Sequence, residues 1–134
     1  MGKFKNTALV QGVYAAFLNG DIPGVLNRLA DDVEWTVGVP SQVPWFGARK
    51  GKAAVQEFIQ TLGREVDMTA LETTDYVAQH DKVIAFVRME FTVKRTNKTV
   101  AQDIAMVWTV RDGAIAGFHT YEDTAAVIGA WDGA

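Results

Sequence analysis

The spacing of apolar residues in the first half of the chain is that of α-helices. Between residues 4 and 18 apolar side chains recur every three or four positions, which predicts an amphipathic helix. Gly20 then favours a helix end, and Asp21 can cap a second helix that has Pro23 in its first turn. The two helices should pack as an antiparallel pair. Their apolar stripes are Leu9, Val10, Val13, Tyr14 and Phe17 in the first and Val25, Leu26 and Leu29 in the second.

A stretch rich in turn residues separates this pair from a third helix. Asp31-Asp32 ends the pair. Residues 33–37 are short and β-prone, and residues 38–51 combine two prolines with three glycines, which predicts a structured loop. The third helix follows and ends at Gly63. Its buried face consists of Val55, Phe58, Ile59 and Leu62.

The second half of the chain has the pattern of β-strands. Four strand-like runs occupy residues 66–78, 83–94, 99–110 and 114–122. Short polar connections separate them, which is typical of an antiparallel meander. A short helix over residues 124–131 follows. We therefore predict one α+β domain over residues 1–134, with three N-terminal helices packed on one face of an antiparallel sheet and a short C-terminal helix.

The lengths of the hairpin loops decide which side chains share a face of this sheet, because a shift of one residue reverses a whole strand. Arg111-Asp112-Gly113 suits a three-residue loop, a type I turn closed by Gly113 in a left-handed bulge. This loop pairs Val110 with Ala114. We predict a second three-residue loop over residues 96–98. A two-residue loop at either place would undo the assignment of faces that follows.

With these loops, one apolar face of the sheet carries a single pair of charged residues. Arg88 lies beside Met106 on this inner face, and Glu90 lies beside Ile104. The apolar side chains of the predicted inner face are Phe86, Ile104, Met106, Trp108 and Phe118. An apolar wall with a few polar groups is typical of a small-molecule pocket.

The opposite, outer face of the predicted sheet is also too apolar to stay in contact with water. It carries Val87, Met89, Phe91, Val107 and Tyr121. Because a monomer rarely exposes a patch of this kind, we expect a homodimer through the outer face. His119 shares that face with Tyr121 and Asp103, which favours an interface or structural role for His119 over a catalytic one.

The composition excludes several classes of function. Thirteen basic against sixteen acidic residues give a net charge of −3, so no basic excess is present for binding a nucleic acid. The 134 residues contain no cysteine, which excludes disulfides, zinc ribbons and thiol catalysis. The two histidines have no clustered ligands, and no glycine-rich phosphate loop is present, so we expect neither a metal nor a cofactor. No apolar run reaches the length of about 18 residues that a membrane span needs, so we expect no membrane association and a cytoplasmic location.

Four short segments form a further pattern along the chain. They are Ala30-Asp31-Asp32-Val33-Glu34-Trp35, Gly47-Ala48-Arg49-Lys50-Gly51, Val110-Arg111-Asp112-Gly113-Ala114-Ile115 and Tyr121-Glu122-Asp123-Thr124. In their order and spacing the chain resembles the nuclear transport factor 2-like superfamily over nearly its whole length. It is most similar to the SnoaL-like group, named for polyketide cyclases, with ketosteroid isomerase and limonene-epoxide hydrolase as relatives. The resemblance implies a curved sheet that forms a cone with an internal pocket.

The resemblance does not bring a complete catalytic set with it. In the isomerase a tyrosine and two aspartates do the work, and Val13, Val37 and roughly Met106 occupy those positions here. The epoxide hydrolase has an Arg-x-Asp sequence, which Arg88-Met89-Glu90 matches with glutamate in place of aspartate. Its second aspartate corresponds to Thr120. The isomerase machinery is therefore absent, and half of the hydrolase set is present.

Glu90 is the candidate general base of the predicted pocket, and Arg88 could orient it or stabilise an oxyanion. Desolvation raises the pKa of a carboxylate in an apolar pocket, while an adjacent arginine lowers it. The alternative interpretation of the two residues is an exposed cross-strand ion pair of little energetic value. The candidate ligand-binding residues, whose aromatic members could equally belong to the core, are Tyr14, Phe17, Trp35, Val37, Trp45, Phe86, Met106, Trp108, Phe118 and Thr120.

Three hypotheses about function remain open at this point. The first is a homodimeric protein that binds a small hydrophobic or aromatic molecule in the cone. If it is an enzyme, it would catalyse a cofactor-independent isomerisation, cyclisation or epoxide-type hydrolysis by acid–base chemistry. The second is a non-catalytic ligand carrier, which the missing carboxylate at Thr120 favours. The third, a dimerisation or interaction module, follows if Arg88 and Glu90 face outward.

Overall fold

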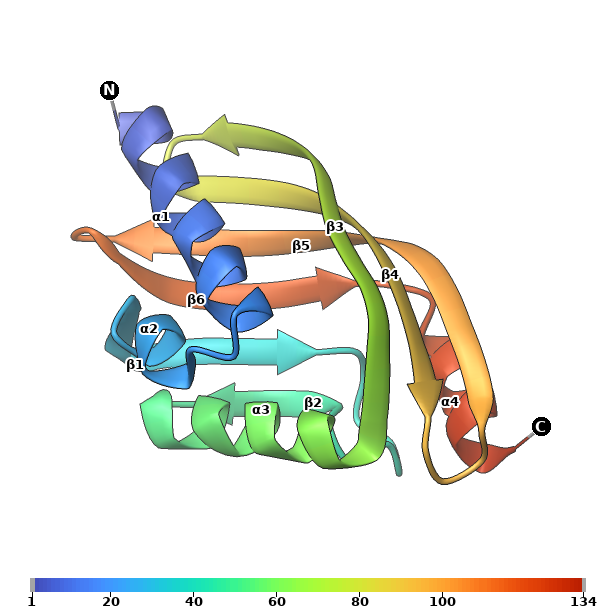
Figure 1. Cartoon of the computed structure of the whole chain (residues 1–134). Coiled ribbons are helices and arrows are strands. Elements are labelled where there is room, and N and C mark those ends of the chain that lie inside the picture. The colour runs from blue at the N-terminus through green and yellow to red at the C-terminus, as the bar shows by residue number, and fades with distance from the viewer. Residues whose placement is uncertain (1, 134) are drawn as a thin grey trace.

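Six strands form one sheet in the order β2-β1-β6-β5-β4-β3, shown in Figure 1 for the computed structural model of the chain. The structure describes residues 2–133, and the side chains of residues 4–133. The strands are β1 (Leu29–Val37), β2 (Gly47–Lys50), β3 (Val66–Gln79), β4 (Lys82–Val93), β5 (Lys98–Arg111) and β6 (Ala114–Tyr121). The long strands β3, β4 and β5 bend along their length (Figure 1).

Helices cover the inner face of this sheet and one of its ends. The helix α1 (Gly2–Leu18) crosses the sheet and packs on β3, β4 and β6, whereas α3 (Lys52–Glu65) packs on β1, β2 and β3 (Figure 1). The short helix α2 (Ile22–Leu26) contacts both α1 and α3, and α4 (Thr124–Asp132) packs on β5. Among the described residues, no helix is both long and apolar enough to cross a membrane.

The short helices begin where the sequence places capping residues. The side chain of Asp21 accepts a hydrogen bond from the backbone N–H of Gly24 at 3.0 Å, with Pro23 in the first turn of α2. At the start of α4, Asp123 accepts one from the backbone N–H of Ala126 at 3.1 Å. The predicted cap and turn of the second helix are therefore confirmed.

The region from residue 29 to residue 51 contains more strand than the sequence predicts. The strand β1 begins at Leu29, which was expected on the second helix, and β2 lies inside the predicted loop. The aspartates of β1 disfavour a strand locally, but distant backbone groups pair with this segment: Ile115 donates to the carbonyl of Arg28 and Gly51 to that of Val33, each at 2.8 Å. In consequence α3 follows two strands rather than the helical pair.

The sheet is mixed, which corrects the prediction of a purely antiparallel sheet. The strands β1 and β6 pair parallel, with Trp35 opposite Phe118, while the other neighbours pair antiparallel. A parallel pair needs a long crossover connection. Here the segment from α3 through β5 lies within that connection. The pairing of two strands so far apart in the chain cannot be predicted from the local pattern of residues.

The turn between β4 and β5 is one residue longer than the predicted loop, and this difference reverses β4. Residues 94–97 form a four-residue turn. Arg88 therefore pairs with Asp103 rather than with Met106. Because directly opposite residues lie on the same face, the odd-numbered residues of β4 share the inner face with the even-numbered residues of β5.

The turn between β5 and β6 also differs from the prediction, but here two differences cancel. Asp112 and Gly113 form a two-residue turn, both with positive φ, 53° and 76°, as tight hairpin turns favour. A bulge between residues 109 and 110 then restores the original parity. As a result Trp108 pairs with Phe118, whereas the predicted pairing of Val110 with Ala114 would place Trp108 opposite Ala116. The even-numbered residues of both strands share the inner face in either register.

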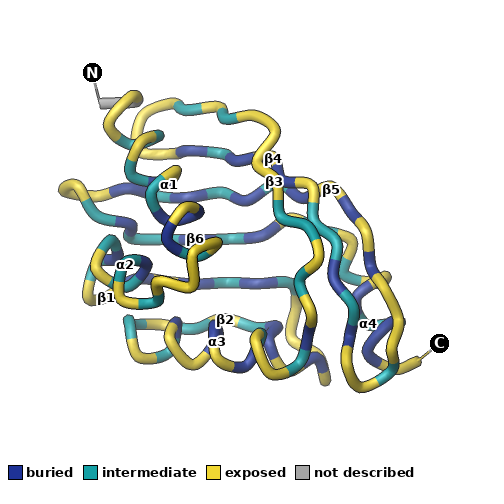
Figure 2. The backbone as a smooth tube through the Cα atoms, in the orientation of Figure 1, coloured by how far each residue is buried: buried dark blue, intermediate teal, exposed yellow. Residues whose placement is uncertain are grey.

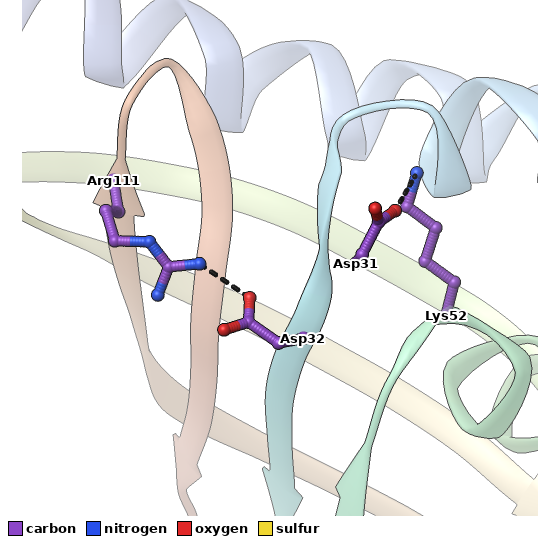
Figure 3. A network of polar contacts seen from close by, with 4 residues as sticks. All are labelled: Asp31, Asp32, Lys52 and Arg111. Carbon is purple, nitrogen blue, oxygen red and sulfur yellow. Dashed lines mark hydrogen bonds and ion pairs between the residues drawn. The ribbon is translucent and has the colours of Figure 1, made fainter.

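Two exposed ion pairs fix the beginning of β1 to its neighbours (Figure 3). Asp32 Oδ1 accepts a hydrogen bond from Arg111 Nη2 at 2.5 Å, and Asp31 Oδ1 lies 3.6 Å from Lys52 Nζ. The hydrogen bond from Arg111 lowers the pKa of Asp32 below its ordinary value. These pairs connect β1 with the start of α3 and with the end of β5, and exposed pairs of this kind contribute little to stability.

Candidate functional site

A cavity of about 100 Å³ lies between the helices and the inner face of the sheet, with walls that are almost wholly apolar. Nine of the ten expected ligand-binding residues line it, namely Tyr14, Phe17, Trp35, Val37, Trp45, Met106, Trp108, Phe118 and Thr120. The other lining residues are Val13, Val25, Phe58, Ile59, Leu62, Met68, Leu71, Met89, Phe91, Ile104 and Glu122. The inner face of β5 and β6 was thus predicted well.

Phe86 is the expected lining residue that the structure places elsewhere. Its side chain lies on the outer face and is 41% exposed, because β4 is reversed. The same reversal brings Met89 and Phe91, which were expected outside, to the cavity wall, and buries Val87 in the core. The predicted apolar outer face is therefore wrong for these three residues.

Arg88 and Glu90 lie on the outer face too, so their expected position in the pocket is wrong. Arg88 Nη1 lies 3.5 Å from Asp103 Oδ1, and the two side chains are 49% and 84% exposed. Glu90 stands opposite Ala101, and its backbone carbonyl accepts a hydrogen bond from Thr69 Oγ1 at 3.1 Å. The structure matches the alternative of an exposed cross-strand ion pair for Arg88, and it leaves no geometric basis for a catalytic Arg88–Glu90 pair in the cavity.

The carboxylate that does line the cavity belongs to Glu122, which follows the end of β6. The predicted inner face ends at Thr120 and therefore does not include Glu122. The signal was present in the sequence: Phe118, Thr120 and Glu122 alternate with outward residues, so all three share one face. Thr120 occupies the position where the resemblance expects a carboxylate, and Glu122 lies two residues further along.

Glu122 is held by two side chains that donate hydrogen bonds to it. Thr120 Oγ1 donates to Glu122 Oε1 at 2.7 Å, and Gln102 Nε2 donates to Glu122 Oε2 at 3.2 Å. Both donors are buried, with 6% of Thr120 and 7% of Gln102 exposed. Each carboxylate oxygen thus has one fixed partner on the protein side.

Two backbone N–H groups set the direction of these hydrogen bonds. The N–H of Gly38 donates to Thr120 Oγ1 at 3.0 Å, so the hydroxyl proton of Thr120 is directed to Glu122. The N–H of Asp123 donates to Gln102 Oε1 at 2.9 Å, which orients the amide so that its nitrogen faces Glu122. The network therefore makes both oxygens of Glu122 acceptors.

Burial raises the pKa of Glu122 above its ordinary value. The hydrogen bonds from Thr120 and Gln102 act in the opposite direction, because they favour the ionised form, and the charge of Asp123 adds to the increase. Desolvation is the largest of these effects. A carboxylate in this environment is a proton acceptor whose pKa is moved toward neutrality.

Tyr14 and Trp108 form a second polar contact in the cavity wall. Tyr14 Oη donates to Met106 Sδ at 3.0 Å and accepts a hydrogen bond from Trp108 Nε1 at 3.1 Å. Burial raises the pKa of Tyr14 far above its ordinary value, so this hydroxyl remains protonated at neutral pH. Both hydrogen-bonding directions of the hydroxyl are used within the protein, which favours a structural role for it.

Trp35 lies at the centre of the aromatic part of the wall. Its ring centroid is 4.2 Å from that of Phe118 and 5.7 Å from that of Trp108. Its indole Nε1 is buried and has no hydrogen-bond partner among the described residues. An unpartnered buried N–H is costly, so this indole is an exception among the buried polar groups of a folded protein.

The histidines lie away from the cavity. His119 stacks on Tyr121 on the outer face, with ring centroids 4.4 Å apart and an interplanar angle of 10°. His80 occupies the exposed turn between β3 and β4 with a φ of 55°. The described part of the chain contains no group of three or more His, Cys, Asp or Glu side chains that could hold a metal ion.

Comparison with known sequences and structures agrees with this architecture. The family model of the SnoaL-like domain matches residues 10–118. The curated proteins include no match to the sequence. A nuclear transport factor 2-like protein from Burkholderia xenovorans LB400 has a similar structure, with a TM-score of 0.87, 30% identity and 96% of each chain covered.

Two further solved structures are similar over nearly the whole chain. A nuclear transport factor 2-like protein of unknown function from Burkholderia pseudomallei K96243 has a TM-score of 0.84 at 25% identity, with 94% of this chain and 96% of that chain covered. TerC, co-crystallised with polyporic acid, has a TM-score of 0.83 at 28% identity, with 96% of this chain and 98% of that chain covered.

Proposed function

This chain belongs to the SnoaL-like family of the nuclear transport factor 2-like superfamily, and we propose that it binds a small hydrophobic or aromatic molecule in the cavity beneath α1 and α3. The observation that carries the proposal is the wall of that cavity. It is apolar and aromatic except for a few polar groups, of which Glu122 is the only carboxylate among the described lining residues. Apolar walls provide affinity for such a molecule, and the few polar groups orient it.

The size of the cavity favours a ligand with one aromatic ring, or a larger one that moves side chains at the wall. A cavity of roughly 150 Å³ with apolar walls holds benzene in another protein, and the cavity here is about 100 Å³. Phe17, Leu62, Met68 and Leu71 line it while being only partly buried. Flexible side chains such as these can change rotamer to enlarge the space.

The similarity to TerC supports an aromatic ligand. That protein was crystallised with polyporic acid, and it shares 28% of its residues with this chain. Polyporic acid therefore belongs in a ligand screen of this protein, beside single-ring and polycyclic aromatics, terpenoids and epoxides.

If the protein is an enzyme, the cavity supports cofactor-independent acid–base chemistry, an isomerisation, cyclisation or epoxide-type hydrolysis, with Glu122 rather than Glu90 as the proton acceptor. The described lining residues include no second carboxylate, and Thr120 occupies the position where the resemblance expects one. A mechanism that uses one carboxylate therefore fits this cavity better than one that uses two. The alternative is a ligand carrier without catalysis.

A thermal-shift screen tests ligand binding. A ligand at about a hundredfold its dissociation constant stabilises the folded state by roughly 2.7 kcal/mol, a shift of several degrees. The variant Leu62→Trp fills the cavity from α3 and should abolish the shift, whereas Gln60→Trp adds the same side chain to the exposed side of α3 and should keep it. A screen without any stabilising compound, or equal shifts for both variants, would contradict the proposal.

Product analysis of each screening hit separates an enzyme from a carrier. Incubation of the wild-type protein with a hit, followed by NMR of the small molecule, detects isomerised, cyclised or hydrolysed product. Product that forms with wild type and not with Glu122→Gln supports acid–base catalysis. Unchanged ligand in the presence of bound wild-type protein supports the carrier.

A specific observation also favours the expected homodimer through the outer face of the sheet, and with it the third hypothesis, a dimerisation or interaction module. Arg88 and Glu90 lie on that face, as this third hypothesis requires. Phe86 and Tyr121 expose 41% and 58% of their surface there, and the ring of Tyr121 is held by His119. We propose that these side chains form the centre of a dimer interface, with Arg88 in its polar surroundings.

Light scattering coupled to size-exclusion chromatography tests the dimer. Wild-type protein should elute with the mass of a dimer, and Tyr121→Lys should elute as a monomer. Leu18→Lys is the control, because Leu18 is 60% exposed at the end of α1, a helix that packs on the inner face of the sheet. A monomeric wild type, or a Tyr121→Lys variant that stays dimeric, would exclude this interface.

A further inference from the structure

Glu122 and the two side chains that donate hydrogen bonds to it form the polar end of the cavity. Glu122 accepts hydrogen bonds from Thr120 and Gln102, and the backbone N–H groups of Gly38 and Asp123 fix the direction of both. An ionised carboxylate has about four acceptor positions, of which two are occupied here. The remaining lone pairs of Glu122 belong to a side chain that lines the cavity.

Burial decides what kind of group Glu122 can accept as a partner. Removing a carboxylate from water is costly unless donors replace the water. Of the described lining residues, Thr120 donates to it, whereas the hydroxyl of Tyr14 is engaged with Met106 and Trp108. A ligand that brings another hydrogen-bond donor lowers this cost, whereas a ligand carboxylate would add a second negative charge.

The donor on the ligand must also be compatible with the apolar wall. An ammonium or guanidinium group would have to lose its hydration in a cavity whose aromatic side chains include Trp35 and Phe118. A neutral hydroxyl on a ring has a much smaller hydration cost and leaves the rest of the molecule apolar. A hydrogen bond from a neutral hydroxyl to a carboxylate is also stronger than one between two neutral groups.

Building on the proposed function, we propose that Glu122 is the ligand-binding carboxylate of this cavity and that it accepts a hydrogen bond from the hydroxyl of a ring-bearing phenol or enol. Thr120 and Gln102 are its positioning residues. They hold the two oxygens as acceptors and leave free lone pairs for the ligand hydroxyl. The ligand class is thus a neutral, weakly acidic aromatic or cyclic hydroxyl compound.

The test compares p-cresol with p-xylene, in which a methyl group replaces the hydroxyl at nearly the same size. Isothermal titration calorimetry gives the affinity of wild type and of Glu122→Gln for both compounds. The ratio of the affinity for p-cresol to that for p-xylene should fall about tenfold or more in Glu122→Gln, because the charge-assisted hydrogen bond is lost. The affinity for p-xylene should stay within about twofold in both proteins.

The pH dependence of binding provides a readout that a purely structural role of Glu122 would not change. As the pH falls through the raised pKa of Glu122, the carboxylate is protonated and the affinity of wild type for p-cresol should fall. Asp123 is the charged neighbour that acts on this pKa, and Tyr14 is the other titratable side chain of the described lining. Glu122→Gln should bind p-cresol with an affinity that does not change over the pH range in which the affinity of wild type falls.

Thr120→Val is the matched variant for the positioning residues and a second test if Glu122→Gln does not fold. It keeps the shape of the side chain, removes one donor to Glu122, and should move the midpoint of the pH dependence of p-cresol binding to higher pH. If p-xylene binds, and the ratio of the affinity for p-cresol to that for p-xylene is the same in Glu122→Gln as in wild type, the role of Glu122 is refuted. The cavity then remains a binding site. If neither compound binds wild type, the binding proposal fails, and the role of Glu122 fails with it.

Discussion

The two faces of β4 and β5 place consecutive residues in opposite environments. Val87 and Ile104 on the inner face are each 2% exposed, whereas the side chains of Arg88 and Asp103, their sequence neighbours on the outer face, are 49% and 84% exposed. Figure 2 shows this difference as an alternation of buried and exposed colours along the strands. Both faces come from the same strands, so the register of pairing decides which chemistry the cavity contains.

Two carboxylates show what this difference means for function. Asp32 is exposed at the beginning of β1, where the hydrogen bond from Arg111 lowers its pKa. Glu122 lines the cavity, where burial raises its pKa although two neutral side chains donate to it. The same functional group therefore has a lowered pKa on the surface and a raised pKa in the cavity wall.

The largest loss of unfolding free energy should come from Ile104→Ala on the inner face. Loss of a buried isoleucine side chain leaves a cavity and costs about 2–5 kcal/mol of unfolding free energy. Asp103→Ala, one residue earlier on the exposed face, should cost less than about 1 kcal/mol. Urea unfolding followed by tryptophan fluorescence measures both. Equal losses for the two variants would mean that β5 has a different register.

Tyr14→Phe should have the next largest effect. The substitution leaves Trp108 Nε1 without its acceptor in a buried position, which costs about 1–3 kcal/mol of unfolding free energy. Tyr121→Phe is the control, because Tyr121 is 58% exposed on the outer face, and its unfolding free energy should stay within about 0.5 kcal/mol of wild type. Equal stability of Tyr14→Phe and wild type would show that the hydroxyl does not satisfy the indole.

Much of the fold follows from periodicity in the sequence. The three-and-four spacing that predicts the first helix and the alternation in β5 and β6 both depend on side chains within one element. For this reason the inner positions of β5 and β6, such as Met106, Trp108 and Phe118, were predicted correctly. Glu122 obeys the same alternation, because it is the next inward position after Thr120.

The reversal of β4 could not be predicted from local sequence, because a distant helix holds the turn before β5. Within residues 94–97, Thr96 Oγ1 donates a hydrogen bond to the carbonyl of Ala130 at 2.5 Å. The guanidinium of Arg95 lies 4.8 Å from the ring centroid of Trp131. These contacts with α4 stabilise a four-residue turn where the sequence alone favours three. One additional residue then moved Arg88 and Glu90 out of the predicted pocket.

Glu122→Gln should change the pH dependence of stability. Because the folded pKa of Glu122 is raised, the folded chain retains this proton at a pH where the unfolded chain has lost it. The unfolding free energy of wild type should therefore fall relative to that of Glu122→Gln as the pH rises from the unfolded pKa, about 4.3, to the folded pKa, and the difference should be constant above it.

The size of this effect is about 1.4 kcal/mol for each unit that separates the two pKa values of Glu122. Urea unfolding of both proteins at half-unit intervals from pH 4 to pH 8 measures it, an interval chosen to begin near the ordinary pKa of glutamate. Parallel curves for the two proteins would show that Glu122 has the same pKa in the folded and unfolded chains. Glu90→Gln, which changes a glutamate of the outer face, is the matched control for the loss of one carboxylate.

The smallest loss of unfolding free energy should come from Arg88→Ala on the outer face. The ion pair of Arg88 with Asp103 is 3.5 Å long and exposed, and such pairs contribute less than about 1 kcal/mol of unfolding free energy. Salt screens them, so the difference between wild type and variant should shrink further at about 1 M NaCl, where the Debye length is roughly 3 Å. A loss above about 3 kcal/mol that persists in salt would be the signature of a charge whose partner is left buried and unpaired. That result would return Arg88 to the inner face, and with it the register of β4 in which Glu90 also lies in the pocket.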